Sequence, residues 1–260
     1  GLSDGTVTVT ASVTDAAGNT GTGTHNVTVD TGLPSVAFNA ISGDNVLNAV
    51  EKGQDLSVSG TSANLAEGTV VTVILNGKNY AATTAADGTW SLTVPAADLA
   101  GLGQASYTLN ATATNGVGNS VSNTANLLVD TALPTVTINT VAGDNVINAA
   151  EVAAGQTLSG TVANAEAGNT VTVTLGGNSY TATVQNDLTW SVNVPSDVLT
   201  ALGNGSLSVT ATVTNGHGNT GTGEREIAID ANLPGLRVDT VAGDDVINTI
   251  EHAQNLIVTG

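Results

Sequence analysis

The sequence predicts an all-β protein made of tandem sandwich domains, and three observations support this prediction. Val, Ile and Thr are abundant, and their branching at Cβ suits pleated, half-buried strands. Short segments in which apolar and polar residues alternate are separated by turn residues, as expected for antiparallel strands. The same motifs return every 100 residues, which is the pattern of a repeated domain.

The repeat fixes the expected domain boundaries. Residues 31–130 and 131–230, aligned without a gap, are identical at 44 of 100 positions. Each unit ends in Val-Asp or Ile-Asp, so we expect two complete domains, 31–130 and 131–230. Residues 1–30 are then the last two strands of a preceding repeat, and residues 231–260 are the first two strands of a following one. Neither end segment can bury an apolar face alone, so we expect each to be disordered or to pair with a neighbouring molecule.

The second repeat carries the clearest strand signals. Its expected strands are Thr135–Thr140, Thr157–Val162, Asn169–Leu175, Ser179–Val184, Thr189–Val194, Ser206–Thr214 and Glu224–Ile229. The turn Gly176-Gly177-Asn178 joins two of them as a hairpin. Residues 196–202 can form a helical turn, with Ser196 as N-cap and Gly203 as terminator. Seven short strands in 100 residues predict an immunoglobulin-like sandwich, repeated in an elongated array. Trp90 and Trp190 are expected to pack in the cores.

Composition argues against several classes of function. The chain has 22 Asp and Glu against 4 Lys and Arg, a net charge of −18, which repels nucleic acid and anionic membranes. No stretch of apolar residues is long enough to insert into a membrane, and the N-terminus lacks a signal-peptide pattern. Gly1 lies inside a strand-like pattern, so we expect a longer parent chain. An enzyme is not expected, because no nucleophile stands beside a base and the acids recur in every unit.

Acidic residues recur at three kinds of position. One ends each unit, a second occupies a Gly-Asp-Asn/Asp-Val-Ile/Leu-Asn-X-X-Glu loop, and a third precedes the last strand. The members are Asp30, Asp130 and Asp230; Asp44 with Glu51, Asp144 with Glu151 and Asp244 with Glu251; and Asp15, replaced by Asn115 and Asn215 in the later units. Calcium takes about six to eight oxygen ligands. A linker aspartate such as Asp30 would add a third carboxylate to the loop that follows it, so the sequence predicts Ca²⁺ near domain junctions.

Two alternatives stay open at this point. In the first alternative, Asp44 and Asp144 do no more than cap turns, and Glu51 and Glu151 are solvated without a ligand. The loop before the last strand lies opposite the chain's exit in a sandwich, so the sequence does not show whether it joins a junction. Magnesium suits a flexible loop poorly. Zinc is not expected, because the chain has no Cys and its histidines do not recur: His25, His217 and His252.

These motifs together resemble a known family. Val-Asp-X-X-X-Pro, Gly-Asp-Asn-X-Ile-Asn-X-X-Glu, Asp-Gly-Thr-Trp-Ser at Asp87–Ser91, and Asn-Gly-X-Gly-Asn look like the bacterial Ig-like repeats of giant Bap-type and RTX-like surface adhesins. The resemblance covers essentially the whole chain. It implies a protein secreted by a type I system to the bacterial cell surface, with a role in cell adhesion or biofilm formation.

In that family such repeats form long rods of neighbouring repeats, often stiffened by calcium at interdomain sites. The resemblance therefore implies a stalk or spacer, with a glycan or surface receptor bound by regions outside this segment. Asp15 keeps the family's Asp-X-X-Gly-Asn loop, whereas Asn115 and Asn215 predict weaker sites. The alternative is that loops of these repeats bind a glycan or host receptor themselves. The scarcity of aromatic residues, which stack on sugars, argues against it.

Overall fold

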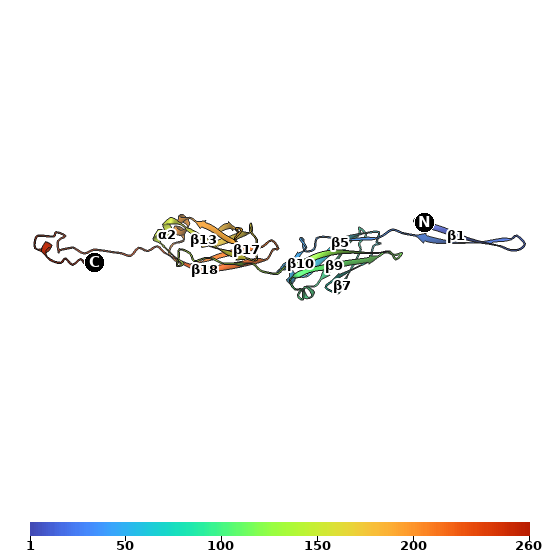
Figure 1. Ribbon diagram of the computed structural model, residues 1–260, viewed down its shortest axis with the longest axis horizontal. Helices are drawn as coiled ribbons and strands as arrows, with labels where there is room; N and C mark the ends of the chain where they lie inside the picture. Colours follow the sequence, from blue (N-terminus) through green and yellow to red (C-terminus); the bar gives the residue numbers. More distant parts are fainter. The chain divides into compact units, whose positions relative to one another are not determined.

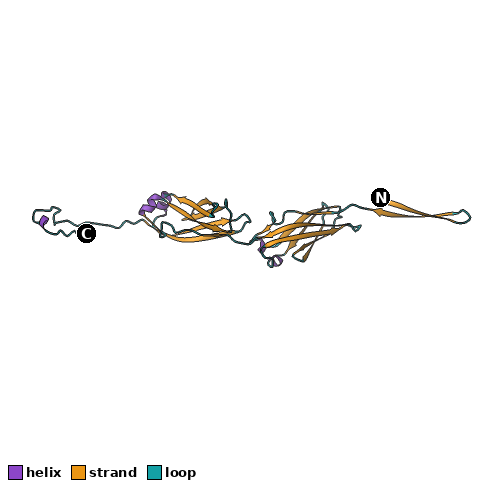
Figure 2. Cartoon of the chain, viewed as in Figure 1, coloured by secondary structure: helices purple, strands orange, loops and turns teal.

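The computed structural model describes all 260 residues, and strands dominate it (Figure 2). The chain forms two compact units. The first contains Gly1–Leu133 together with Thr214–Thr220, and the second contains Pro134–Val213 and Gly221–Gly260. Each unit holds one immunoglobulin-like sandwich, so the predicted fold class is confirmed.

The sandwich of the first unit consists of two sheets (Figure 1). One sheet has the order β3-β5-β8 and the other has the order β4-β10-β9-β6-β7. Their elements are β3 (Ser35–Phe38), β4 (Val46–Leu47), the 3₁₀ turn η1 (Glu51–Gly53), β5 (Leu56–Ala63), β6 (Val70–Leu75), β7 (Lys78–Thr83), β8 (Thr89–Val94), α1 (Ala96–Leu99), β9 (Ala105–Thr114) and β10 (Ser120–Val129).

Alternation along the strands builds the core of this sandwich. Strand β8 reads exposed, buried, exposed, buried throughout, so every second side chain faces the other sheet. Trp90, with Phe38 edge-on at 5.4 Å between ring centroids, meets Val71, Leu109 and Leu127 of the larger sheet in one cluster. The Trp90 Nε1–H donates to Thr61 O at 3.1 Å, which satisfies its one polar atom.

The first unit also contains a separate hairpin of β1 (Gly5–Thr14) and β2 (Thr20–Val29). Its residues align with those of β9 and β10 by the 100-residue shift. Leu109 and Leu127 are fully buried in the sandwich, whereas their counterparts Val9 and Val27 are 54% and 44% exposed. The hairpin therefore has the strand pairing of a sandwich without its packing.

The second unit repeats the same topology, with sheets β11-β13-β16 and β12-β18-β17-β14-β15. Its core is centred on Trp190, which is 1% exposed. Its elements are β11 (Thr135–Val136), β12 (Val146–Asn148), α2 (Ala149–Ala154), β13 (Gln156–Ala163), β14 (Thr170–Leu175), β15 (Asn178–Thr183), β16 (Thr189–Val194), α3 (Ser196–Leu202), β17 (Gly205–Thr214) and β18 (Thr220–Asp230), with η2 (Glu251–Ala253) beyond.

The expected elements of this repeat match closely, with four differences, one of which is the additional short strand β12. The N-cap of α3 is Pro195, whose side chain makes no capping bond, so the assignment of that role to Ser196 was wrong. The ring of Pro195 fixes φ at −65°, which places an extended residue directly before the helix. Gly203 ends the helix with φ of 69°, as expected. Strand β11 is shorter than Thr135–Thr140, and helix α2 was not anticipated.

Candidate functional site

The aspartate that ends the first repeat lies beside the acidic loop of that same repeat. Strand β4 pairs in parallel with the end of β10, with Val129 opposite Leu47. The Asp130 N–H then donates to Leu47 O at 3.2 Å. Asp130 therefore adjoins the loop that carries Asp44 and Glu51.

This arrangement differs from the expected grouping of Asp30 with Asp44 and Glu51. The carbonyl of Asp30 accepts from Asn119 Nδ2 at 3.2 Å, and Asn119 directly precedes β10, whereas Asp130 directly follows it. Ten strand residues span about 33 Å, so Asp30 and the Asp44 loop lie at opposite ends of the sandwich. The chain runs the length of the domain between them. In the second repeat, Asn148 is likewise opposite Asp230, which groups Asp230 with Asp144 and Glu151.

The acids of the loop have defined structural roles. Asp44 Oδ1 accepts from the Val46 N–H at 2.9 Å, and Glu51 Oε2 accepts from the Asn48 N–H at 3.0 Å. Asn48 Oδ1 in turn accepts from the Glu51 N–H at 3.0 Å. The same pattern recurs at Asp144, Asn148 and Glu151, where it forms a capping box on α2, and at Asp244, Asn248 and Glu251. Turn capping is thus one function of these residues.

Capping uses one oxygen of each carboxylate. Asp44 Oδ2 and Glu51 Oε1 make no hydrogen bond to the protein. Asp44 is exposed and Glu51 is half-buried. The loop can therefore offer further oxygens to a cation without losing its own turn.

The loop Asn215–Asn219 belongs to the first unit. It contacts both Asp130 and the Asp44–Glu51 loop. Asn219 Nδ2 donates to Asp130 O at 2.9 Å, and Asn219 Oδ1 accepts from the Ala49 N–H at 2.8 Å. Asn219 is 1% exposed, and a buried amide stays favourable when its polar atoms are paired. We call Asp44–Glu51, Asp130 and Asn215–Asn219 the Asp130 cluster. The loop before the last strand, whose position the sequence left open, takes part in it.

His217 also belongs to this cluster, although the absence of a recurring histidine argued against a zinc site. Its Nδ1 lies 2.6 Å from Asp130 Oδ2. The His217 contact, followed by the Ala132 N–H, holds the pKa of Asp130 below its usual value. The signal available in the sequence was its position inside the Asn-Gly-X-Gly-Asn motif, where Val117 and Ala17 stand in the other copies.

The same loop forms without these partners at the tip of the β1–β2 hairpin. Asp15 Oδ1 accepts from the Ala17 and Asn19 N–H groups, and Asp15 Oδ2 accepts from Asn19 Nδ2 at 3.0 Å. These bonds, chiefly those from Asn19, lower the pKa of Asp15. Asn115 makes the equivalent turn bonds to Val117 and Asn119. The replacement of the acid by an amide keeps the turn and removes the charge.

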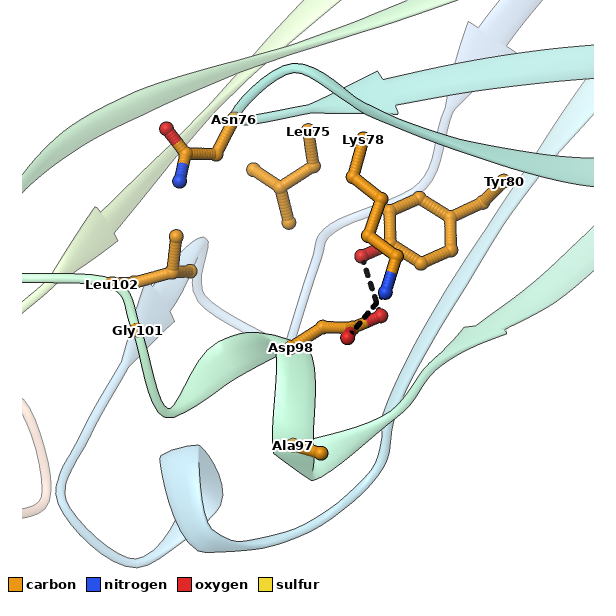
Figure 3. A pocket seen from close by; sticks show the side chains of 8 residues that line it. All are labelled: Leu75, Asn76, Lys78, Tyr80, Ala97, Asp98, Gly101 and Leu102. Carbon is orange, nitrogen blue, oxygen red and sulfur yellow. Dashed lines mark hydrogen bonds and ion pairs between the residues drawn. The ribbon is translucent and has the colours of Figure 1, made fainter.

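One further polar group lines a cleft of about 270 Å³ in the first unit (Figure 3). Asp98 accepts hydrogen bonds from Lys78 Nζ and, at 2.9 Å, from Tyr80 Oη. Burial and then the Asp98 carboxylate raise the pKa of Tyr80 to about 12. The second repeat has Asn178 and Val198 at the matching positions, so this group is specific to the first. Its charges are already paired with each other.

Comparison with known proteins places this geometry in a family. The family model for the bacterial Ig-like domain matches residues 35–131. The structure of a 1.5-MDa bacterial ice-binding adhesin, described for its host cell surface retention, is 31% identical with a TM-score of 0.52. That match covers 87% of this chain and 74% of the other. The chain belongs to the bacterial Ig-like domain family.

A second adhesin structure aligns with these bacterial Ig-like repeats at 33% identity and a TM-score of 0.55. It is a Ca²⁺-stabilized adhesin that helps an Antarctic bacterium reach out and bind ice. The match covers 97% of this chain and 64% of that one, so this chain spans less than two thirds of its relative. A search among curated proteins finds no match. No helix is long and apolar enough to cross a membrane.

The side chains of the Asp130 cluster offer the type of oxygen ligand that Ca²⁺ binds, but too few acidic side chains converge to form a complete site. Carboxylates, amides and backbone carbonyls are the oxygens that Ca²⁺ prefers. No three acidic or histidine side chains converge as a metal-binding group anywhere in the chain. Asp130, Asp44 and Glu51 therefore do not form such a group in this structure. To hold Ca²⁺, their carboxylates would have to move closer together, and neutral oxygens would have to complete the shell.

Proposed function

We propose that this chain is a spacer segment of a large bacterial surface adhesin, in which each repeat extends the protein and calcium stiffens it. The tandem sandwiches and the two adhesin relatives support the spacer role. A type I secretion route, location on the cell surface and a part in biofilm formation belong to the same proposal. They follow from the resemblance of the motifs.

The observation that carries the calcium proposal is the Asp130 cluster. Three segments far apart in the sequence meet there through Asp130, Ala49 and Asn219. Asp130, Asp44 and Glu51 would hold Ca²⁺ in the first repeat, and Asp230, Asp144 and Glu151 would hold it in the second. Asp30 and Asp15 would serve neighbouring repeats, as would Asp244 and Glu251.

The protein's own residues already hold this cluster in part. Asn219 joins Asp130 to the Asp44–Glu51 loop by two hydrogen bonds, and His217 Nδ1 contacts the Asp130 carboxylate. When bound, Ca²⁺ would supply the positive charge that lets the remaining carboxylates lie close together. Because Asn215–Asn219 is continuous with β17 and β18, a fixed cluster would limit bending between repeats.

Thermal denaturation combined with small-angle scattering tests this proposal. At a calcium concentration of about 100 times Kd, binding adds about 2.7 kcal/mol to stability, which corresponds to a rise in Tm of roughly 10 °C or more. We expect the maximum dimension in solution to increase as well, and EDTA to reverse both effects. Equal values with calcium and with EDTA would contradict the calcium role. A glycan array on the same chain tests the rival binding function, and specific retention of a glycan would support that rival.

A further inference from the structure

The two repeats differ at a cleft between β3 and β10. In the first repeat this cleft has a volume of about 500 Å³, and its lining includes Phe38, Asn45 and Ala125. This volume lies within the range of small-ligand sites. None of its lining residues carries a charge.

In the second repeat, an arginine from the same chain occupies the equivalent place. Arg225 Nε donates to Ile138 O at 2.7 Å, and Arg225 Nη1 lies 3.5 Å from Asn145 Oδ1. By the 100-residue shift, Ile138, Asn145 and Arg225 correspond to Phe38, Asn45 and Ala125. The first repeat therefore has the pocket of Arg225 without the arginine.

The carbonyl acceptor keeps its direction in the first repeat. The Asn39 N–H donates to Ser59 O at 2.9 Å, so Asn39 faces β5 and its neighbour Phe38 faces away from it. Val36, two residues earlier, already points its carbonyl toward β10, where it accepts from Asn123 Nδ2 at 2.8 Å. The carbonyl of Phe38 therefore lies on the β10 side, as the carbonyl of Ile138 does.

The amide acceptor is also held in the same conformation in both repeats. Asn45 and Asn145 have φ of 66° and 67°. Asn45 Oδ1 accepts from the Ile41 N–H at 2.9 Å, and Asn145 Oδ1 accepts from the Val141 N–H at 3.1 Å. Both oxygens are thus fixed by the turn, and each has a second lone pair for another donor.

We propose that the cleft of the first repeat binds a guanidinium group supplied from outside the chain, either by free arginine or by an arginine side chain of a partner. A planar guanidinium presents several donors in a fixed fork and suits two preset acceptors better than an ammonium does. The net charge of −18 attracts such a cation to the surface. Ala125 leaves the volume that the stem of Arg225 fills in the second repeat.

NMR titration of the ¹⁵N-labelled 260-residue chain tests this proposal. With N-acetyl-arginine amide, we expect saturable shifts of the Phe38, Asn39 and Asn45 amides in the millimolar range. N-acetyl-lysine amide at equal ionic strength should bind at least fivefold more weakly. Free arginine and the peptide Gly-Arg-Gly form the other arms: tighter binding of free arginine indicates the amino acid, and tighter binding of the peptide indicates a partner's side chain. Equal shifts with the lysine and arginine probes would overturn the proposal.

Two variants identify the cleft itself. Ala125→Arg supplies an internal guanidinium and should abolish the arginine-induced shifts. Arg225→Ala should open the second cleft and create new shifts at Asn139 and Asn145. If Ala125→Arg does not fold, Arg225→Ala still tests the cleft. The control is the wild-type chain, in which Arg225 fills the cleft of the second repeat. Shifts that persist in folded Ala125→Arg, or their absence in Arg225→Ala, would count against the cleft. The spacer and calcium proposals do not depend on this result.

Discussion

Single residues give two copies of one scaffold different surface chemistry. Asp98 pairs with Lys78 and Tyr80 in the first repeat, whereas Val198 leaves the buried hydroxyl of Tyr180 without a partner in the second. Arg225 fills a cleft that Ala125 leaves open. His217 adds a hydrogen-bond partner for Asp130 where the other copies of the loop have an apolar residue.

The Tyr80–Asp98 contact predicts a specific alkaline titration. The folded-state pKa of Tyr80 is about 12, above its ordinary value of 10. Tyr80 therefore contributes stability that is fully present below pH 10 and is lost as the pH rises toward 12. Tyrosine absorbance should show one of the three tyrosines titrating near pH 12 in the folded chain.

Asp98→Ala should lower the pKa of Tyr80 from about 12 toward 10, because the substitution removes both the carboxylate charge and its hydrogen bond. Asp197→Ala, on the corresponding helix α3, is the matched control and should leave it in place. Titration of Tyr80 near pH 10 in the wild-type chain would contradict both the burial of its hydroxyl and its contact with Asp98.

At the scale of elements, close approach of strands depends on glycines such as Gly160 of β13. A Cβ at Gly160 would lie 1.8 Å from Thr137 O and 2.8 Å from Trp190 Cζ2. Gly160→Ala should therefore cost about 3 kcal/mol of unfolding free energy, through displacement of β11 or of the indole. Gly177 has a positive φ of 81° but open space around it, so Gly177→Ala should cost only about 1 kcal/mol.

Urea denaturation followed by Trp190 fluorescence, in a Trp90→Phe background, measures both glycine variants. Equal losses of stability for the two would contradict the packing of Trp190 against Gly160.

The hairpin β1–β2 provides a second test at this scale. Its pairing is as regular as that of β9 and β10, but an isolated hairpin is only marginally stable in water. Amide hydrogen exchange should therefore be fast at Val9 and Val27 and slower by at least a hundredfold at Leu109 and Leu127. Comparable protection at the two sets of residues would show that the hairpin is stable without further strands.

Sequence patterns predicted the elements better than their contacts. Alternation identified β14 and β16 nearly to the residue, because burial on one face imposes a period of two. Helix α2 was not predicted, because Glu151 was interpreted either as a calcium ligand or as a solvated side chain and not as part of a capping box with Asn148. The partner of each linker aspartate could not be read from spacing, because it depends on the parallel pairing of β4 with β10. Proximity in sequence favoured Asp30, and topology favours Asp130.

At the scale of the whole molecule, the repeats share the residues that form the sandwich and its acidic loops, and they differ in several polar side chains outside the core. The Asp44–Glu51 loop, its counterparts and the linker aspartates recur in register, whereas Lys78, Arg225 and His217 each occur once. This pattern is suited to a spacer that keeps one architecture along its length. Calcium would act on the recurring part in every repeat, with weaker sites expected where Asn115 and Asn215 replace the acid of Asp15.

Isothermal titration calorimetry with Ca²⁺ on the wild-type chain and on Asp130→Asn tests the central claim most directly. Asn is nearly the same size and can keep the contacts of the turn, but it lacks the charge. Asp197→Asn is the control for a general loss of negative charge. The account predicts saturable binding by the wild type, unchanged in the control and lost or at least tenfold weaker at one site in Asp130→Asn. Wild-type binding that Asp130→Asn leaves intact, or no binding at all, would contradict it.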